Sequence, residues 1–421
     1  MMERNGARPE TPTFGCSKWE WIDSALLWIL CRAGSVFTFE RAMRTCCEHF
    51  VLLLLLAARE NQSVASGRGE GEALLLTEFE RPEDLRDLQG TPFILVSESS
   101  LHRDVAGRLS LLDTRDYSRH VLEPTEQAPA ALSIFADPAC IPTRTLAPHG
   151  IDILQNKDSS WQVAVVNHYE YESIEFFVLD IAGGNSTATL APAGCTRNLG
   201  GGDIHNSVSY IQTRTGSLQK ESLAVTLWFD TFYGWFGQLL FYWSFLDPFP
   251  NAGSGALKMV GPGGTPARIV AEPLNGSNGL LYADCRRVLV ALTSAGSIVE
   301  IDPTTGTSKR VLRTNMPDNL LRGPNEEAKS SSSAVLLTRI DSSLIPTALC
   351  YLTSWPLLCR NMKFSVVEYD DNNNNARVLY SGSNQGFTTV GMIKDDVLYV
   401  GTLQFNRLLV LPGITSASFN S

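Results

Sequence analysis

The chain has 421 residues, of which 44% are hydrophobic and 19% are charged, a balance typical of a folded globular protein. The length allows one large domain or two to three ordinary ones. The formal net charge is −10. Because phosphate binding requires a basic face, this acidic balance excludes nucleic acid as an expected partner.

The first 75 residues are interpreted as a leader outside the fold. Phe50–Ala58 is an uninterrupted apolar run (FVLLLLLAA) that follows Arg41 and Arg44. The run is too short for a membrane-spanning helix, but it suits the hydrophobic region of a secretion signal. With Met43 as the initiator, segment 43–66 predicts a protein that is secreted or delivered to the endomembrane lumen. A membrane anchor and a short buried segment are the alternatives.

Cysteine usage fits the same compartment. The chain has nine cysteines but no CxxC spacing, so a zinc or iron–sulfur centre has no support. The odd count leaves the pairing open, although disulfide bonds are expected in a secreted protein. Three glycosylation sequons begin at Asn61, Asn185 and Asn275, which is compatible with a glycoprotein.

From about residue 80 onward, the chain has the pattern of short strands separated by turns. Runs rich in Val, Leu, Phe and Tyr are bounded by Gly, Asp, Asn or Pro, and no long helical period separates them. Such a pattern favours a barrel, a sandwich or a propeller. The expected strands are Thr91–Ser97, Gly107–Asp113, Gln162–Asn167, Ser173–Asp180, Leu223–Phe229, Gln238–Phe245, Arg287–Leu292, Gly296–Asp302, Ser333–Thr338, Phe364–Tyr369, Arg377–Tyr380, Asp396–Gly401 and Arg407–Val410.

Two other kinds of segment stand out between these strands. Gly253–Pro266, Arg322–Ser332 and Asp370–Ala376 have the composition of surface loops. Asp230–Gly237 is strongly aromatic and is interpreted as a lid over a lipophilic substrate or as a contact with a membrane or lipid surface. A membrane span is not expected there, because an aspartate and two glycines interrupt the apolar run from residue 223 to residue 249.

A series of short polar motifs carries the candidate chemistry. In order they are Arg81–Leu85 (RPEDL), Pro148–Ile151 (PHGI), Val165–His168 (VVNH), Ser277–Leu280 (SNGL), Pro317–Asn319 (PDN) and Leu398–Thr402 (LYVGT). Asp and Asn at such positions commonly make turns. Their oxygens are also the ligands that Ca²⁺ prefers, in sets of six to eight. Candidate oxygen donors are Glu83, Asp84, Asn206, Asn278, Asp318 and Asn319.

Taken in this order, the motifs resemble those of the paraoxonase family of calcium-dependent lactonases and arylesterases, from about Glu83 to Leu411. The resemblance implies an all-β fold, a six-bladed β-propeller over residues 76–421, and a small lipophilic ester or lactone as substrate. It implies that His149 is the general base and that His168 is its relay. A catalytic Ca²⁺ is then held by Glu83, Asn206, Asn278, Asp318 and Asn319.

The resemblance also implies a second, structural calcium ion, bound by the Asp84 carboxylate and the Ile151 carbonyl. Here the chain departs from the family, because Ser207 stands where the family has an aspartate. A polar segment of the family is matched by Thr226–Phe229 (TLWF), and a pocket histidine falls near Arg339. These departures keep two rival readings open: a non-catalytic propeller that binds a partner, and a strictosidine-synthase-like propeller without calcium.

Overall fold

The computed structural model divides the chain into two units, Met1–Ser63 and Val64–Ser421, and all residues described below belong to the second. The expected leader therefore lies outside the described residues, apart from residues 73–75. No helix in the described part of the chain is long and apolar enough to cross a membrane. The described residues are 73–99, 105–126, 132–181, 188–197, 199, 203–212, 218–230, 255–284, 287–323, 334–342, 347, 350, 359, 361–370, 374–383 and 385–414.

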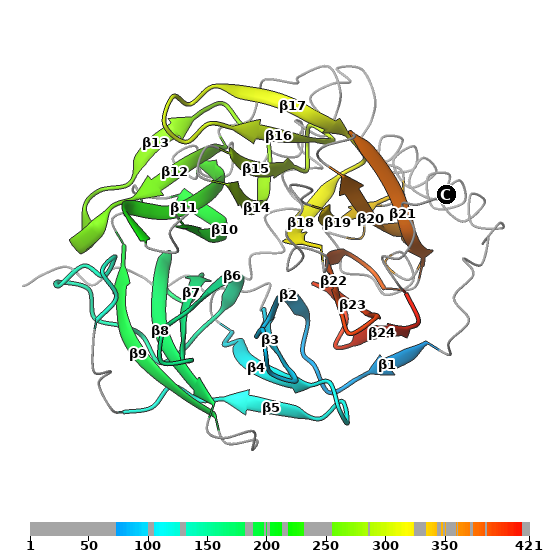
Figure 1. The fold of residues 1–421 in the computed structure, drawn as a ribbon, viewed down its shortest axis with the longest axis horizontal. Helices are drawn as coiled ribbons and strands as arrows, with labels where there is room; N and C mark the ends of the chain where they lie inside the picture. Colours follow the sequence, from blue (N-terminus) through cyan, green and yellow to red (C-terminus); the bar gives the residue numbers. More distant parts are fainter. Residues whose placement is uncertain are drawn as a thin grey trace, which may run out of the picture. The chain divides into compact units, whose positions relative to one another are not determined.

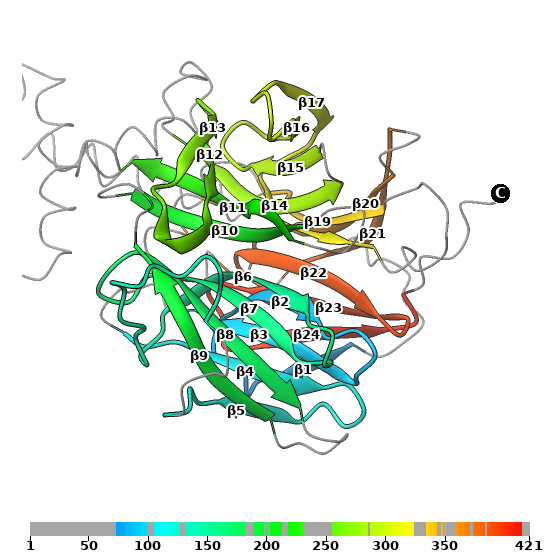
Figure 2. The same cartoon turned by 60° about the vertical axis from the view of Figure 1, so that its left-hand side comes forward.

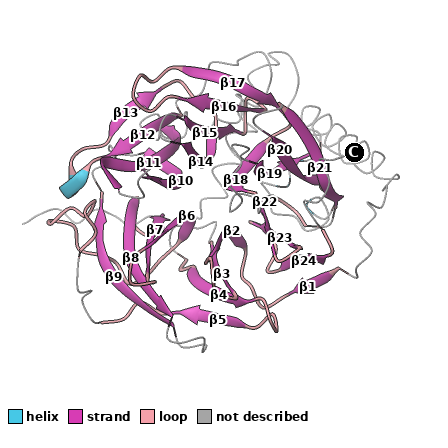
Figure 3. Cartoon of the chain, viewed as in Figure 1, coloured by secondary structure: helices cyan, strands magenta, loops and turns pink. Residues whose placement is uncertain are grey.

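The described residues of the second unit form 24 strands in six antiparallel sheets of four strands each (Figures 1 and 3). One 3-10 turn, η2 (Pro262–Gly264), follows β12. The strands of the first three sheets are β2 (Pro82–Asp87), β3 (Phe93–Glu98), β4 (Arg108–Asp113) and β5 (Arg119–Leu122); β6 (Pro148–Gln155), β7 (Trp161–Asn167), β8 (Ser173–Ile181) and β9 (Ala188–Thr196); and β10 (Asp203–Gln212), β11 (Leu218–Asp230), β12 (Ala256–Val260) and β13 (Arg268–Ala271).

The remaining three sheets follow the same order from inside to outside. They are β14 (Ser277–Asp284), β15 (Arg287–Leu292), β16 (Ser297–Ile301) and β17 (Ser308–Arg313); β18 (Pro317–Arg322), β19 (Ala334–Ile340), β20 (Phe364–Asp370) and β21 (Asn375–Gly382); and β22 (Thr388–Lys394), β23 (Val397–Thr402), β24 (Leu408–Pro412) and β1 (Leu74–Leu76).

The sheets close into a ring. The first strand of each sheet contacts the first strand of the next, from β2 through β6, β10, β14, β18 and β22 back to β2 (Figures 1 and 2). Strand β1 completes the last sheet by pairing with β24, so that the first and last of the described strands share one sheet. The fold is a six-bladed β-propeller, and the predicted fold class is confirmed.

The hydrophobic core lies between neighbouring blades rather than within one of them. Leu111 of the first blade and Val163 of the second belong to one buried cluster, and Phe176 and Val225 join the second blade to the third. Each such buried side chain contributes about 1.5–3 kcal/mol. Packing on both faces explains why the middle strands are nearly continuous apolar runs.

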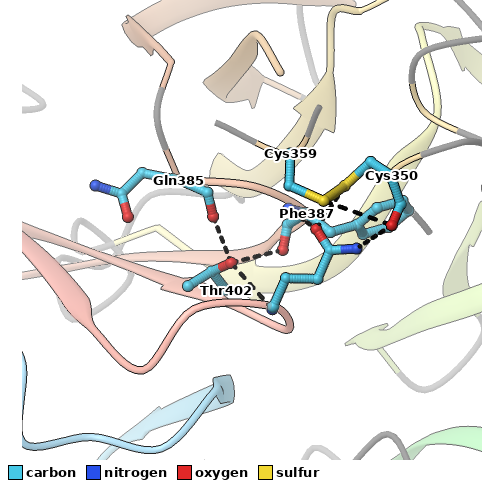
Figure 4. The surroundings of a disulfide bond; sticks show 6 residues. Cys350, Cys359, Gln385, Phe387 and Thr402 are labelled. Carbon is cyan, nitrogen blue, oxygen red and sulfur yellow. Dashed lines mark hydrogen bonds between the residues drawn. A yellow bond between two sulfur atoms is a disulfide. The ribbon is translucent and has the colours of Figure 1, made fainter. Parts of the chain in front are cut away.

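Two disulfides lie among the described residues, which confirms the expected disulfide bonding. Cys140–Cys195 joins the connection before β6 to β9. Cys350–Cys359 lies in the connection between β19 and β20, next to the last blade (Figure 4). There the Thr402 hydroxyl donates hydrogen bonds to backbone carbonyls of that blade.

Two sequence expectations need comment. The loop expected at Gly253–Pro266 is wrong in its centre, because Ala256–Val260 forms strand β12. All five side chains of this strand are buried, and Leu257 and Met259 pack against the neighbouring blade, which outweighs the flanking Gly and Pro. The expected lid at Asp230–Gly237 and the strand Gln238–Phe245 lie outside the described residues, except that Asp230 ends β11.

Candidate functional site

Every inner strand carries an irregularity near its first residues, and the candidate site residues lie within these irregularities. In β6, β10, β14 and β18, two consecutive residues lie opposite one residue of the partner strand, which is a β-bulge. In β2 and β22 a single residue, Glu83 or Thr389, is skipped by the pairing. A bulge redirects a side chain out of the regular alternation. The skipped residues are Glu83, His149–Gly150, Asn206–Ser207, Asn278–Gly279, Asp318–Asn319 and Thr389.

Two of these positions require glycine because the inner strands approach one another closely. A Cβ on Gly150 would lie 2.5 Å from the Asn206 carbonyl oxygen, and a Cβ on Gly279 would lie 2.4 Å from the Asp318 carbonyl oxygen. Both distances are too short for any side chain. The glycines of the PHGI and SNGL motifs thus allow neighbouring inner strands to bring their polar residues together.

Four oxygen-bearing side chains from three blades (Glu83, Asn278, Asp318 and Asn319) form a buried cluster, and Asn206 lies at the equivalent bulge of β10, which packs against β14. Glu83, Asn206, Asn278, Asp318 and Asn319 are each at most 3% exposed. The Asn319 amide donates to Glu83 Oε1 at 3.1 Å, and Asn278 forms a side-chain hydrogen bond with Asp318.

Each of the five keeps one oxygen without a hydrogen-bond partner within the described structure. Such buried, unsatisfied polar atoms are rare in folded proteins, and each costs about 1–3 kcal/mol. Five such oxygens at the bulges of the inner strands indicate that the site is shaped for a ligand that binds to oxygen atoms. The oxygens are Glu83 Oε2, Asn206 Oδ1, Asn278 Oδ1, Asp318 Oδ1 and Asn319 Oδ1.

The electrostatics of the cluster favour a cation. Burial raises the pKa of Glu83 well above its usual range, and the carboxylates of Asp84 and Asp318 raise it further. Burial, followed by Asp84, also raises the pKa of Asp318. Buried like charges of this kind oppose ionisation unless a positive charge lies between them. Among the described residues, no group of three or more His, Cys, Asp or Glu is suited to hold a metal ion. The oxygens available for a cation here come from two carboxylates and three amides.

Two histidines lie beside this cluster. His149 Nδ1 is 3.3 Å from Glu83 Oε1, and its ring centroid is 5.1 Å from that of His168 in an edge-on arrangement. Burial, followed by the proximity of His168, lowers the pKa of His149 to about 3. The His149 imidazole is therefore neutral at pH 7, the form in which it can accept a proton.

The structure adds Glu172 to this histidine pair. Both carboxylate oxygens of Glu172 lie 2.9 Å from His168 Nδ1, and the backbone N–H of His205 donates to Glu172 Oε2 at 3.4 Å. An acceptor on Nδ1 selects the tautomer with the proton on that nitrogen, which leaves Nε2 as the acceptor. Sequence reasoning missed Glu172, although its position four residues after His168, in the turn between β7 and β8, was an available signal.

The residues expected to hold a second calcium ion are arranged differently. Arg86 Nη1 lies 2.5 Å from Asp84 Oδ1, and the backbone N–H of Ile151 donates to Asp84 Oδ2 at 2.9 Å. Both oxygens of Asp84 are therefore already engaged by hydrogen-bond donors. Because Ser207 also supplies no carboxylate, these residues do not fit a second metal ion.

Hydroxyl groups fix the backbone around the cluster. The Thr226 hydroxyl accepts the Ser207 N–H at 2.9 Å and donates to the Asn278 carbonyl at 2.7 Å, which joins the third blade to the fourth. The Thr389 hydroxyl donates to the Glu83 carbonyl at 2.7 Å and joins the sixth blade to the first. Arg339, near the position of the family's pocket histidine, pairs with Asp341 at 2.8 Å.

No protein-family model matches this chain, and no curated protein matches it in sequence. Among solved structures, a luciferin-regenerating enzyme is similar at 9% identity and a TM-score of 0.47, over 83% of this chain and 98% of that one. A calcium-binding protein, regucalcin from Agrobacterium tumefaciens, is similar at 13% identity and a TM-score of 0.40, over 83% and 95%. A streptogramin B lyase is similar at 11% identity and a TM-score of 0.41, over 82% and 99%. The likeness is one of fold alone.

Proposed function

We propose that this protein is a calcium-dependent hydrolase of lactones or aryl esters, with the ion held by the oxygen cluster where the inner strands meet. One observation carries the proposal: five buried side-chain oxygens from four blades lack any hydrogen-bond partner in the described structure. Five neutral or anionic oxygens, completed by water or substrate, match the six to eight ligands of Ca²⁺. Mg²⁺ keeps several waters and binds fewer protein ligands, so it suits this donor set less well.

The charge of the cluster supports the same ion. Glu83 and Asp318 together supply two negative charges, which one divalent cation neutralises. Asp84 lies next to them but is paired with Arg86. A divalent cation would also reverse the burial penalty that raises the pKa values of Glu83 and Asp318.

The chain's own side chains then perform the proton transfers. A bound calcium ion supplies Lewis-acid polarisation of the ester carbonyl and stabilises the developing oxyanion. His149, neutral and beside Glu83, accepts the proton of the attacking water. His168 lies edge-on to His149 and accepts that proton in turn, while Glu172 holds the ring of His168 in one tautomer.

A binding module is the second candidate function, because substrate-shaping groups differ from those of the resembled family. Thr226 is committed to backbone hydrogen bonds and Leu227 is buried, so neither side chain offers a polar group to a substrate. In this alternative, calcium stabilises the propeller and a partner binds to it without being hydrolysed.

An activity assay on the purified full-length chain separates the two functions. A panel of aryl esters and lactones is incubated with calcium, with a chelator, and with calcium restored after chelation. We expect hydrolysis that chelation abolishes and calcium restores. The control is Glu368→Gln, which removes a buried carboxylate that pairs with Arg377 in the fifth blade; this variant should keep its calcium dependence. Calcium binding without hydrolysis of any substrate would favour the binding module.

The expected surroundings of the enzyme belong to the same proposal. Secretion through segment 43–66 and a lipid-contacting or substrate-covering role for Asp230–Gly237 concern residues that, Asp230 excepted, the structure does not describe. Sequencing the N-terminus of the secreted protein tests the first part, and a start between about residues 58 and 70 is expected. An intact N-terminus on cytosolic protein would contradict it.

A further inference from the structure

Next to the oxygen cluster lies a buried ion pair between Asp84 and Arg86. Arg86 is 8% exposed; its Nη1 lies 2.5 Å from Asp84 Oδ1 and donates to the Leu85 carbonyl at 2.8 Å. Its Nε lies 3.2 Å from Asp152 Oδ1, in the second blade. Burial alone would lower the pKa of Arg86, but the carboxylates of Asp84 and Asp152 raise it overall, so the guanidinium stays charged.

This ion pair occupies the place where the sequence led us to expect a structural calcium ion. The Asp84 carboxylate is already shared between Arg86 and the Ile151 N–H. Ser207 is buried and lies close to Ile151. Its Cα is 2.7 Å from the position that a Cβ on Gly150 would take, and Gly150 is the residue before Ile151. The hydroxyl of Ser207 has no hydrogen-bond partner in the described structure and brings no negative charge.

A chain of contacts that begins at the guanidinium also links three consecutive blades. Asp84 and Arg86 lie on β2, and Asp152 lies on β6. The second oxygen of Asp152 accepts the backbone N–H of Tyr210, on β10, at 2.7 Å. The chain of contacts from Arg86 through Asp152 to Tyr210 thus joins the first blade to the third without any metal ion.

We propose that Arg86 is a built-in cation that takes the place of a second calcium ion, so that the protein binds calcium only at the oxygen cluster, with one ion per chain. The inference rests on the proposed calcium site. A divalent ion cannot share the Asp84 carboxylate with a fixed guanidinium, because the two positive charges would repel one another at short range. The first three blades therefore stay joined when calcium is withdrawn.

Calcium stoichiometry tests this directly, and independently of any enzymatic activity. The full-length chain is stripped of metal with a chelator, transferred to metal-free buffer and titrated with calcium by calorimetry, with equilibrium dialysis as a second measurement. One ion per chain is the expected result. Two ions would overturn the inference and leave the proposed function standing. No bound calcium would overturn the proposed function, and the inference with it.

Variants identify Arg86 as the reason for a single ion. Ser207→Asp alone adds a carboxylate and should still bind one ion, because the guanidinium remains. Arg86→Met combined with Ser207→Asp should bind two ions and should gain a melting temperature that rises with calcium. Arg119→Met is the matched control: it removes an arginine that pairs with the buried Glu98 in the first blade, and it should bind one ion. Two ions in Ser207→Asp, where Arg86 is intact, would overturn the inference even if the double variant failed to fold.

Discussion

Replacing Asp318 by asparagine should stabilise this protein in the absence of calcium and should weaken the stabilisation that calcium confers. The substitution keeps the size and one oxygen of the side chain but removes its charge. In the absence of metal, burial and the neighbouring Asp84 raise the pKa of Asp318 well above its usual value of 3.8. A raised pKa in the folded state costs about 1.4 kcal/mol of stability per unit once the group ionises.

The sign of this effect follows from linkage. A carboxyl group with a raised folded-state pKa favours folding at low pH, and this contribution is lost as the pH rises above 3.8. At pH 7 in chelator, the charge therefore opposes folding, and Asp318→Asn should raise the melting temperature. The new amide can also donate to one of the oxygens that lack a partner. The part of the gain that comes from removing the charge should disappear below about pH 4.

With calcium present, the same substitution should reduce the stabilisation that the ion confers. A ligand at 100 times its Kd stabilises the folded state by about 2.7 kcal/mol. The calcium affinity of an oxygen site increases with the number of charged ligands, and Asp318→Asn removes one of the two carboxylates. A loss of affinity on the order of 100-fold would reduce the stabilisation at that calcium concentration to about 0.4 kcal/mol.

Thermal unfolding by calorimetry at pH 7, in chelator and in calcium, measures both effects. The account requires the melting temperature of Asp318→Asn to lie above that of the wild type in chelator, and it requires calcium to raise the melting temperature of the variant less than that of the wild type. Glu368→Gln, which also removes a buried negative charge, should shift the melting temperature equally in both buffers. An equal rise on addition of calcium in Asp318→Asn and in the wild type would refute a cation site at this carboxylate.

Three further substitutions test neighbouring parts of the account. His149→Gln should lower ester or lactone turnover by about 10²–10⁴-fold while leaving calcium affinity, measured by calorimetry, nearly unchanged. Glu172→Gln should lower kcat by about 10- to 100-fold with little effect on KM, because it removes only the group that orients His168; equal kcat values would contradict the relay. Burial raises the pKa of Glu175 to about 7, so the stability of Glu175→Gln relative to wild type should increase by about 3 kcal/mol between pH 4.5 and 7; denaturant unfolding that shows no such pH dependence would contradict this.

The middle strands of the blades were the part of the fold most accessible from sequence. The expected strand Arg287–Leu292 coincides with β15, and Ser173–Asp180 differs from β8 by one residue. These strands are covered on both faces by neighbouring blades, so their sequences are apolar throughout. Outer strands such as β17 (Ser308–Arg313) were missed because their exposed side chains carry no such pattern.

The inner strands were recognised as motifs but not as strands, for a physical reason. β6 begins with Pro148, His149 and Gly150, and β18 begins with Pro317 and Asp318. These residue types are depleted in regular strands and usually indicate turns. They are accommodated here because each inner strand bulges at this point, and neither the bulge nor the closure of the ring can be deduced from local sequence.

The residues of the candidate site were also only partly accessible from the sequence. Six oxygen donors could be nominated from their residue types, and the family resemblance reduced them to five for the first ion; the structure places those five, buried, at the bulges of the inner strands, and their role as calcium ligands stays a prediction. Arg86 could not be nominated, because its importance depends on contacts made by folding. The partners Arg86 and Asp152 are 66 residues apart in sequence, and only the packing of β2 beside β6 brings them together.

The central claim is that a single calcium ion binds to the five oxygens of the inner strands. Anomalous X-ray diffraction from crystals grown with saturating calcium tests it most directly. The account predicts one strong anomalous peak at about 2.4 Å from oxygens of Glu83, Asn206, Asn278, Asp318 and Asn319, and none beside Asp84 and Arg86. A cluster filled by water alone under those conditions, or a calcium ion bound elsewhere with these oxygens left out, would contradict it.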